Sequence, residues 1–295
     1  MSIIGHKKII DSLERAMLRR NTPLACSYLF CGPEAVGKFL AAKNFSDKLT
    51  NWQKESFNSN LLIIEPEVEE KDGIFKEKEI KIEAIKKLQK EFSLTSFGKN
   101  YRATIIRSAQ KLNISAQNAL LKILEEPPKN TIIILIVEDE KKLLPTIISR
   151  CQIKRFELLS SEEIGEMFDA SLPDREEMIF WSLGRPGWAQ NFLQKETELE
   201  EKKEIAKEFQ SLFSMSLNEK LFLAEQLSKN TPQLLAKIDL WIILLRSIIL
   251  GRKSFVSVFP LKALKLIEEI EKSKKTINGT NSNARLIVEN LLLEF

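Results

Sequence analysis

The sequence predicts an α/β module, a five-stranded parallel sheet with helices on both faces, followed by helices alone. Three observations support this expectation. Short apolar runs alternate with amphipathic helical runs up to about residue 156, which is the pattern of a parallel sheet covered by helices. A loop that contains Gly32 and Gly37 joins the first apolar run to a helical run. After Phe156 the strand-like runs stop, and helical periodicity continues to the last residue.

The expected strands are short runs of mostly apolar and β-branched residues. They cover residues 27–31, 61–65, 104–107, 131–137 and 152–156. Helical periodicity predicts helices over 7–20, 38–49, 82–92 and 115–126. Pro127 and Pro128 stop the last of these helices, because proline cannot continue a helix.

The sequence predicts three domains. Residues 1–157 hold all five strands. A small helical domain is expected over 158–200, because Ser160 and Glu163 form a capping-box start and short helices follow it. The third domain, residues 201–295, is expected to be all-helical. The segment that leads into it, residues 196–203, is predicted to be a charged helix instead of a disordered linker, since its charges alternate in sign at helical spacing.

Charge and cysteine content narrow the range of functions. The sequence has 45 Lys and Arg against 41 Asp and Glu, so 45 − 41 gives +4. The charges alternate in short blocks, which is typical of a solvated surface. Three cysteines without a CxxC pair predict neither a disulfide framework nor a zinc site. The single histidine, His6, is expected to cap local backbone. We expect no signal peptide and no membrane span, and therefore a cytoplasmic protein.

A phosphate-binding loop is predicted after the first strand. Residues 32–39 read Gly-Pro-Glu-Ala-Val-Gly-Lys-Phe, which matches GxxxxGK[ST] except at the last position. In such loops the glycines let backbone N–H groups cradle phosphates, and the lysine reaches the terminal phosphates. Phe39 replaces the hydroxyl that holds Mg²⁺, and a benzyl group cannot coordinate a hard cation. We therefore expect Gly32, Gly37 and Lys38 to form a vestigial phosphate loop without a metal.

A second part of an ATP site is also missing. P-loop ATPases place an Asp at the end of a neighbouring strand to hold the metal, usually followed by another acid. Here that strand ends in Arg107 and Ser108. A cation at this position repels Mg²⁺ instead of ligating it. Arg107 either has a specific role or is a strand-end arginine without one, but both alternatives leave the acid absent, so no intrinsic ATPase activity is expected.

Residues 115–128 carry the most specific signal. They read Ser-Ala-Gln-Asn-Ala-Leu-Leu-Lys-Ile-Leu-Glu-Glu-Pro-Pro and closely resemble a signature of bacterial clamp-loader subunits. Shorter matches are Ile-Gly-His at 4–6, Tyr-Leu-Phe-Cys-Gly-Pro at 28–33 and Thr-Ile-Ile-Ser-Arg-Cys at 146–151. The chain thus resembles the AAA+ clamp-loader family of DNA polymerase III over most of residues 4–156. The resemblance implies an AAA+ module, then a lid domain and a collar domain for oligomerisation.

Departures from the family pattern resemble one of its branches. The motor subunits of the family keep complete ATP sites, whereas the delta-prime subunits are rigid stators with degenerate ones. Besides Phe39 and Arg107, Glu138 follows the fourth strand where a motor has a phosphate-sensing threonine. Trp188 stands where the lid of a motor directs an arginine at the nucleotide, with Arg185 close by. The resemblance implies a non-hydrolysing stator within the DNA polymerase III holoenzyme; the alternative is an ATP-hydrolysing motor of the same family.

The Ser149-Arg150-Cys151 motif is intact. In this family it places the arginine at the subunit surface, facing the ATP of the adjacent motor. An arginine supplied in trans stabilises charge on the transferring phosphoryl group, and its guanidinium can bind phosphate bidentately. The alternative is that Arg150 closes a loop by a salt bridge. The resemblance thus implies Arg150 as a catalytic residue in trans, with ATP and Mg²⁺ on the neighbouring motor. Implied partners are the motor (tau/gamma) and delta subunits, the sliding clamp and primed DNA.

Overall fold

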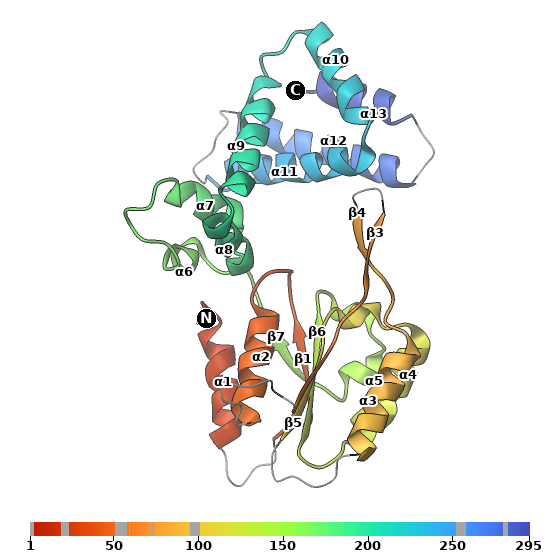
Figure 1. Ribbon diagram of the computed structural model, residues 1–295. Coiled ribbons are helices and arrows are strands. Elements are labelled where there is room, and N and C mark those ends of the chain that lie inside the picture. The colour runs from red at the N-terminus through yellow and green to blue at the C-terminus, as the bar shows by residue number, and fades with distance from the viewer. Residues whose placement is uncertain are drawn as a thin grey trace. The chain divides into compact units, whose positions relative to one another are not determined.

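The computed structural model divides into two compact units, residues 1–193 and 194–295 (Figure 1). The first unit contains all the strands, and the second is helical. The residues described are 3–18, 24–50, 58, 60–71, 74–94, 101–251, 258–279 and 283–295.

The first unit is built on a five-stranded parallel sheet. Its strands are β1 Ser27–Cys31, β2 Leu61–Ile64, β5 Arg102–Ile106, β6 Thr131–Val137 and β7 Gln152–Arg155. Across the sheet the strands lie in the order β2-β5-β6-β1-β7, and every neighbouring pair is parallel. The predicted fold class is confirmed, and each predicted strand is present to within two residues at either end.

Helices cover both faces of the sheet (Figure 1). One face carries α1 Lys7–Leu18 and α2 Lys38–Leu49, and the other carries α3 Ile82–Leu94, α4 Ile114–Glu125 and α5 Pro145–Ile148. Successive side chains of a strand point to opposite faces. Tyr28 and Phe30 of β1 accordingly pack with α1 and α2, whereas Leu29 and Cys31 pack with α3 and α4. This double burial explains why the central strands are continuous apolar runs.

The helix that carries the fourteen-residue signature, α4, is held by its buried face. Leu120 and Leu124 lie in the core. The Gln117 side chain is also buried: its Nε2 donates to the Leu112 carbonyl at 3.0 Å, and its Oε1 accepts from the Leu144 amide at 2.8 Å. These bonds tie α4 to the segments that precede and follow it.

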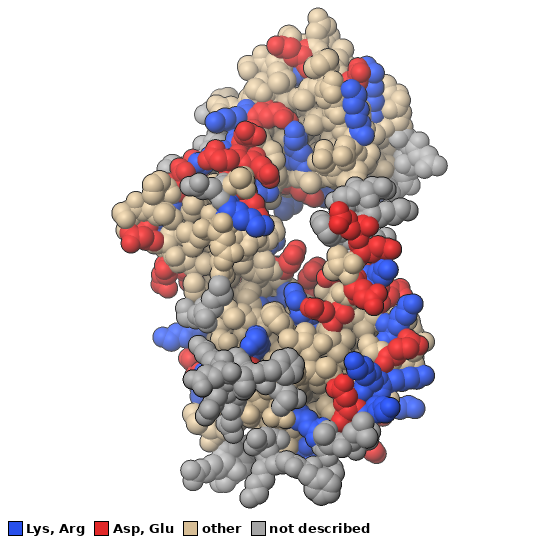
Figure 2. All heavy atoms as spheres, in the orientation of Figure 1, with Lys and Arg blue, Asp and Glu red and all other residues tan. Residues whose placement is uncertain are grey.

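A hairpin that the sequence did not predict lies between β2 and α3. It consists of the antiparallel strands β3 Val68–Lys71 and β4 Ile74–Glu77. Acidic side chains gather over it in Figure 2, and Glu67, Glu69 and Glu70 are exposed. Val68 of β3 is exposed as well. The exposed strand β3 therefore lacks the apolar alternation that identifies a half-buried strand.

Three short helices follow the sheet: α6 Ser161–Gly165, α7 Arg175–Ser182 and α8 Pro186–Gln194. The predicted capping box is present. The Glu163 amide donates to Ser160 Oγ at 3.2 Å, and the Ser160 amide donates to a Glu163 carboxylate oxygen at 3.0 Å.

The second unit consists of α9 Glu196–Ser211, α10 Leu217–Ser228, α11 Thr231–Ile249, α12 Pro260–Gly279 and α13 Ala284–Leu293. The charged segment of residues 196–203 is helical, as predicted. Trp241 of α11 is buried against Phe209 and Phe295, with ring centroids 5.8 Å from each. The apolar run in α11 therefore forms the core of this unit. Among the described residues, none of the helices combines the length and the apolar character that a membrane span requires.

Candidate functional site

The predicted phosphate loop joins the end of β1 to the start of α2. Gly32 and Gly37 have φ values of 142° and 95°, and residues with side chains rarely adopt such conformations. A Cβ on Gly32 would lie 2.0 Å from the Phe156 carbonyl oxygen, so only glycine fits there. A loop at the carboxyl end of a parallel strand and the N-terminus of a helix is the usual position of a phosphate loop.

Lys38 turns back into this loop. Its side chain is almost fully buried, and its Nζ donates to the carbonyl oxygens of Gly32 and Pro33, both at 2.5 Å. Burial lowers the pKa of Lys38, while the carboxylates of Glu138 and Glu34 act in the opposite direction. The ammonium group is thus engaged by the loop itself.

Two further carbonyls of the loop accept hydrogen bonds from distant residues. His6 Nε2 donates to the Val36 carbonyl at 3.0 Å, and burial lowers the pKa of this imidazole. The expectation that His6 caps local backbone is wrong, because its partner lies 30 residues away. The Gly187 amide donates to the Ala35 carbonyl at 2.9 Å. The start of α8 therefore contacts the loop directly.

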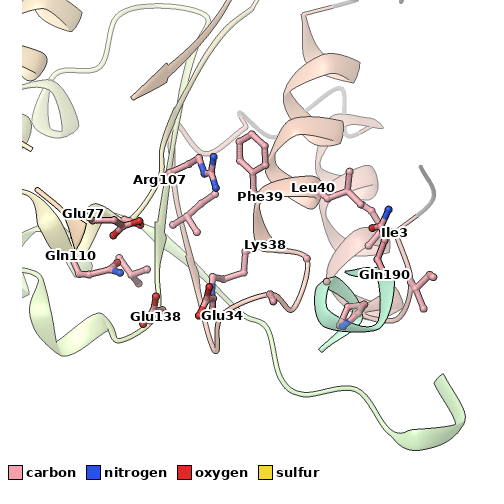
Figure 3. A pocket seen from close by; sticks show the side chains of 18 of the residues that line it. Ile3, Glu34, Lys38, Phe39, Leu40, Glu77, Arg107, Gln110, Glu138 and Gln190 are labelled. Atoms are coloured by element: carbon pink, nitrogen blue, oxygen red, sulfur yellow. The ribbon is translucent and has the colours of Figure 1, made fainter. Parts of the chain in front are cut away.

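The two positions that depart from the ATPase pattern touch each other (Figure 3). The guanidinium carbon of Arg107 lies 4.6 Å from the centroid of the Phe39 ring. Arg107 Nη1 also lies 2.7 Å from Oε2 of Glu65. Neither a benzyl group nor a guanidinium can ligate Mg²⁺. The residues at these two positions therefore do not fit a metal-bound nucleotide.

A cavity of about 650 Å³ lies beside the loop. Its charged lining residues are Lys38, Arg107, Glu34, Glu77 and Glu138 (Figure 3). Among the described residues, three carboxylates and two cations line it, so their formal charges give 2 − 3 = −1. A nucleoside triphosphate in this cavity would meet these carboxylates as well as the two cations.

Arg185 and Trp188, which the sequence raised as alternatives for the lid arginine, lie together. The guanidinium carbon of Arg185 is 4.3 Å from the centroid of the Trp188 ring. Burial lowers the pKa of Arg185, and the Glu34 carboxylate opposes this shift. Neither residue is among the described residues that line the cavity.

Arg150 lies at the opposite edge of the sheet. It precedes β7, whose first residue pairs with Tyr28 near the start of β1, and its carbonyl accepts a hydrogen bond from Ser27 Oγ at 2.6 Å. Parallel strands all begin at one edge and end at the other. The length of β1, about 13 Å at about 3.3 Å per residue, therefore separates the backbone of Arg150 from the chain's own phosphate loop.

The Arg150 side chain is 36 % exposed. Its Nη1 donates to the Thr146 carbonyl at 3.1 Å, and its Nη2 donates to Glu125 Oε1 at 2.8 Å. Ser149 Oγ donates to the same Thr146 carbonyl at 3.1 Å. Burial raises the pKa of the Cys151 thiol to about 11, so this thiol is neutral and packed. The sequence singled out the motif but not Glu125, the partner that the signature helix supplies.

A parallel sheet in the order β2-β5-β6-β1-β7, a phosphate-type loop after β1 and a helix that contacts this loop define an AAA+ P-loop module. Residues 5–160 match the protein family described as DNA polymerase III, delta subunit. Because this match covers more than half of the chain, the chain belongs to that family.

The relatives are similar over part of their length. DNA polymerase III subunit delta' of Bacillus subtilis is 33 % identical over 175 residues, which cover 54 % of this chain and 49 % of that protein. Subunit tau of the same organism is 30 % identical over 177 residues, covering 55 % and 30 %. The chain thus spans half of these relatives or less. A DNA polymerase III gamma subunit-related protein of Thermotoga maritima shares the fold, with a TM-score of 0.51 and 20 % identity over 96 % of this chain and 97 % of that one.

Proposed function

We propose that the chain is a non-hydrolysing stator subunit of the DNA polymerase III clamp loader. In this role it supports ATP-dependent loading of the sliding clamp onto primed DNA, together with motor (tau/gamma) and delta subunits. It supplies Arg150 in trans to the ATP and Mg²⁺ of a neighbouring motor. Residues 158–200 act as its lid domain and residues 201–295 as its collar domain.

The observation that carries the proposal is the position of Arg150. Its guanidinium is partly exposed at the edge of the sheet that faces away from the chain's own phosphate loop. An arginine in this position is unavailable to its own loop and available to a separate subunit. Supplied in trans, it stabilises the negative charge that develops on the transferring phosphoryl group.

Release of Arg150 from Glu125 costs little. The pair is exposed on both sides, and ion pairs of this kind contribute about 0.2–1 kcal/mol. A phosphate group offers the same guanidinium bidentate, charge-assisted bonds, which are stronger. The Glu125 contact is therefore compatible with a guanidinium that is held in place until a phosphate takes over one of its N–H groups.

The test is Arg150→Ala in a reconstituted clamp loader. Steady-state ATP turnover and clamp loading are both expected to fall. Arg155→Ala is the matched control, because Arg155 is also an exposed arginine paired with one carboxylate, Glu140, at 2.8 Å. Turnover and loading unchanged by Arg150→Ala would contradict the proposed role.

The rival function, an ATP-hydrolysing motor of the same family, is tested on the isolated chain. A motor needs hydroxyl and carboxylate metal ligands, and the corresponding residues here are Phe39 and Arg107. We expect no ATP hydrolysis above background by the purified chain. Robust, Mg²⁺-dependent turnover would favour the motor instead.

A further inference from the structure

Arg107 and Ser108 both bind the stems of the β3–β4 hairpin. Arg107 Nη1 donates to Glu65 Oε2 at 2.7 Å, and Ser108 Oγ donates to Glu77 Oε1 at 3.0 Å. Glu65 immediately follows β2 and leads into the hairpin, and Glu77 is the last residue of β4. Two consecutive residues at the end of β5 therefore hold both stems by their side chains.

Backbone bonds bring the same segments together. The Arg107 amide donates to the Ile64 carbonyl at 2.8 Å, and the Lys78 amide donates to the Glu67 carbonyl at 2.8 Å, which closes the base of the hairpin. Ser108 has a φ of 47°, a conformation that costs free energy unless its surroundings fix it. Its bond to Glu77 is one of the contacts that do so.

A third element holds Arg107 from the other side. Phe39 lies in the first turn of α2, and its ring is 4.6 Å from the guanidinium carbon. A cation over an aromatic face is attracted by the negative charge of the π system. The guanidinium thus contacts a carboxylate of the hairpin stem and an aromatic ring of the helix that follows the phosphate loop.

We propose that Arg107 is a positioning residue, and that the residues at the place of the lost metal ligands now hold the β3–β4 hairpin in position. Phe39 orients the guanidinium, Glu65 accepts its hydrogen bond, and the Ser108–Glu77 bond secures the second stem. These contacts fix the orientation of an exposed acidic surface that includes Glu67 and Glu70. They link α2 to the end of β5 through side chains of this chain. This inference goes beyond the role of Arg150 and does not depend on it.

Hydrogen–deuterium exchange of the full chain, read by mass spectrometry, tests whether these contacts hold the hairpin in position. Arg107→Ala is expected to speed amide exchange in β3 and β4 by about ten-fold, since it removes one ion pair and one cation–π contact. Exchange in β1 and β6 is expected to stay as in the parent chain. Phe39→Leu, which keeps the apolar volume but removes the ring, is expected to give the same pattern with a smaller increase.

Three comparisons make the test specific. Arg107→Lys keeps the charge but not the planar guanidinium. Amide exchange of its hairpin should therefore be faster than in the parent chain and slower than in Arg107→Ala. The double variant of Phe39→Leu and Arg107→Ala should exchange no faster than Arg107→Ala alone, because the two residues act through one contact. Arg155→Ala should leave the hairpin unchanged.

Unchanged hairpin exchange in Arg107→Ala would overturn the inference. So would an increase shared equally by β1 and β6, since this would mean that the variant destabilises the whole module. Strictly additive effects of Phe39→Leu and Arg107→Ala would overturn the part assigned to Phe39.

Discussion

The two edges of the central sheet have opposite character. At the carboxyl edge, the residues at the positions of a nucleotide site contact one another: Lys38 bonds to its own loop, and the Arg107 guanidinium lies over the Phe39 ring. At the amino edge, Arg150 remains partly exposed and has a single carboxylate partner. The residues at the positions of a nucleotide site are thus engaged with one another, whereas the arginine at the amino edge stays partly exposed.

The carboxyl edge should be the more sensitive of the two to added volume. Gly32→Ala places a Cβ 2.0 Å from the Phe156 carbonyl oxygen at a φ of 142°. We expect a loss of about 3 kcal/mol or more in unfolding free energy, since a backbone clash adds to conformational strain. Urea unfolding measures this loss.

Gly37→Ala is the matched control for this clash. Its φ is 95°, but a Cβ there would meet nothing within 4 Å. The expected loss is the strain alone, about 1–2 kcal/mol. Equal losses for Gly32→Ala and Gly37→Ala would show that the contact with Phe156 does not govern the loop.

The contact between α8 and the loop should be the next most sensitive. A Cβ on Gly187 would lie 3.0 Å from both the Cβ and the carbonyl oxygen of Ala35. Gly187→Val is expected to cost about 1–3 kcal/mol through overpacking and to speed amide exchange in α8. Exchange in α8 equal to that of the parent chain would contradict the direct docking of α8 on the loop.

The amino edge is tested by removing the partner of Arg150. Glu125→Gln is expected to change the unfolding free energy by less than about 1 kcal/mol, because the pair is exposed, and to leave clamp-loader turnover intact. If Arg150 served only to close a loop by a salt bridge, Glu125→Gln and Arg150→Ala would impair the complex equally. Turnover of the two reconstituted variants distinguishes these outcomes.

The smallest expected effect concerns His6. Burial lowers the pKa of its imidazole below the ordinary value of 6.5, so the neutral form stabilises the folded state. This contribution is fully present above pH 6.5 and is lost as the pH falls through the pKa of the folded state. The thermal midpoint should therefore fall more between pH 7.5 and pH 5.5 in the parent chain than in His6→Gln. Equal falls of the thermal midpoint in the two chains would contradict this contribution of His6.

The sheet could be predicted from the sequence because burial on both faces leaves a clear apolar pattern in β1 and β6. The hairpin could not, because Val68, Glu69 and Glu70 of β3 are exposed and leave no apolar pattern. Local patterns identify elements through the side chains that are buried.

The site was predictable in its residues but not in its contacts. The loop pattern identified Phe39 and Arg107 as departures, yet nothing in a motif indicates that they touch across the fold. The same holds for His6 and Val36 and for Arg150 and Glu125, which lie 30 and 25 residues apart. Such pairs depend on how strands are ordered in the sheet, which the individual motifs do not encode.

We propose that this chain supplies an arginine to ATP hydrolysis on a neighbouring motor subunit and hydrolyses no ATP itself. The most direct test is a reconstituted clamp loader in which only the motor adjacent to this chain can hydrolyse ATP. Single-turnover hydrolysis at that site should fall by about 10³-fold or more in Arg150→Ala, with little recovery in Arg150→Lys. A rate equal to that of the parent complex would contradict the account.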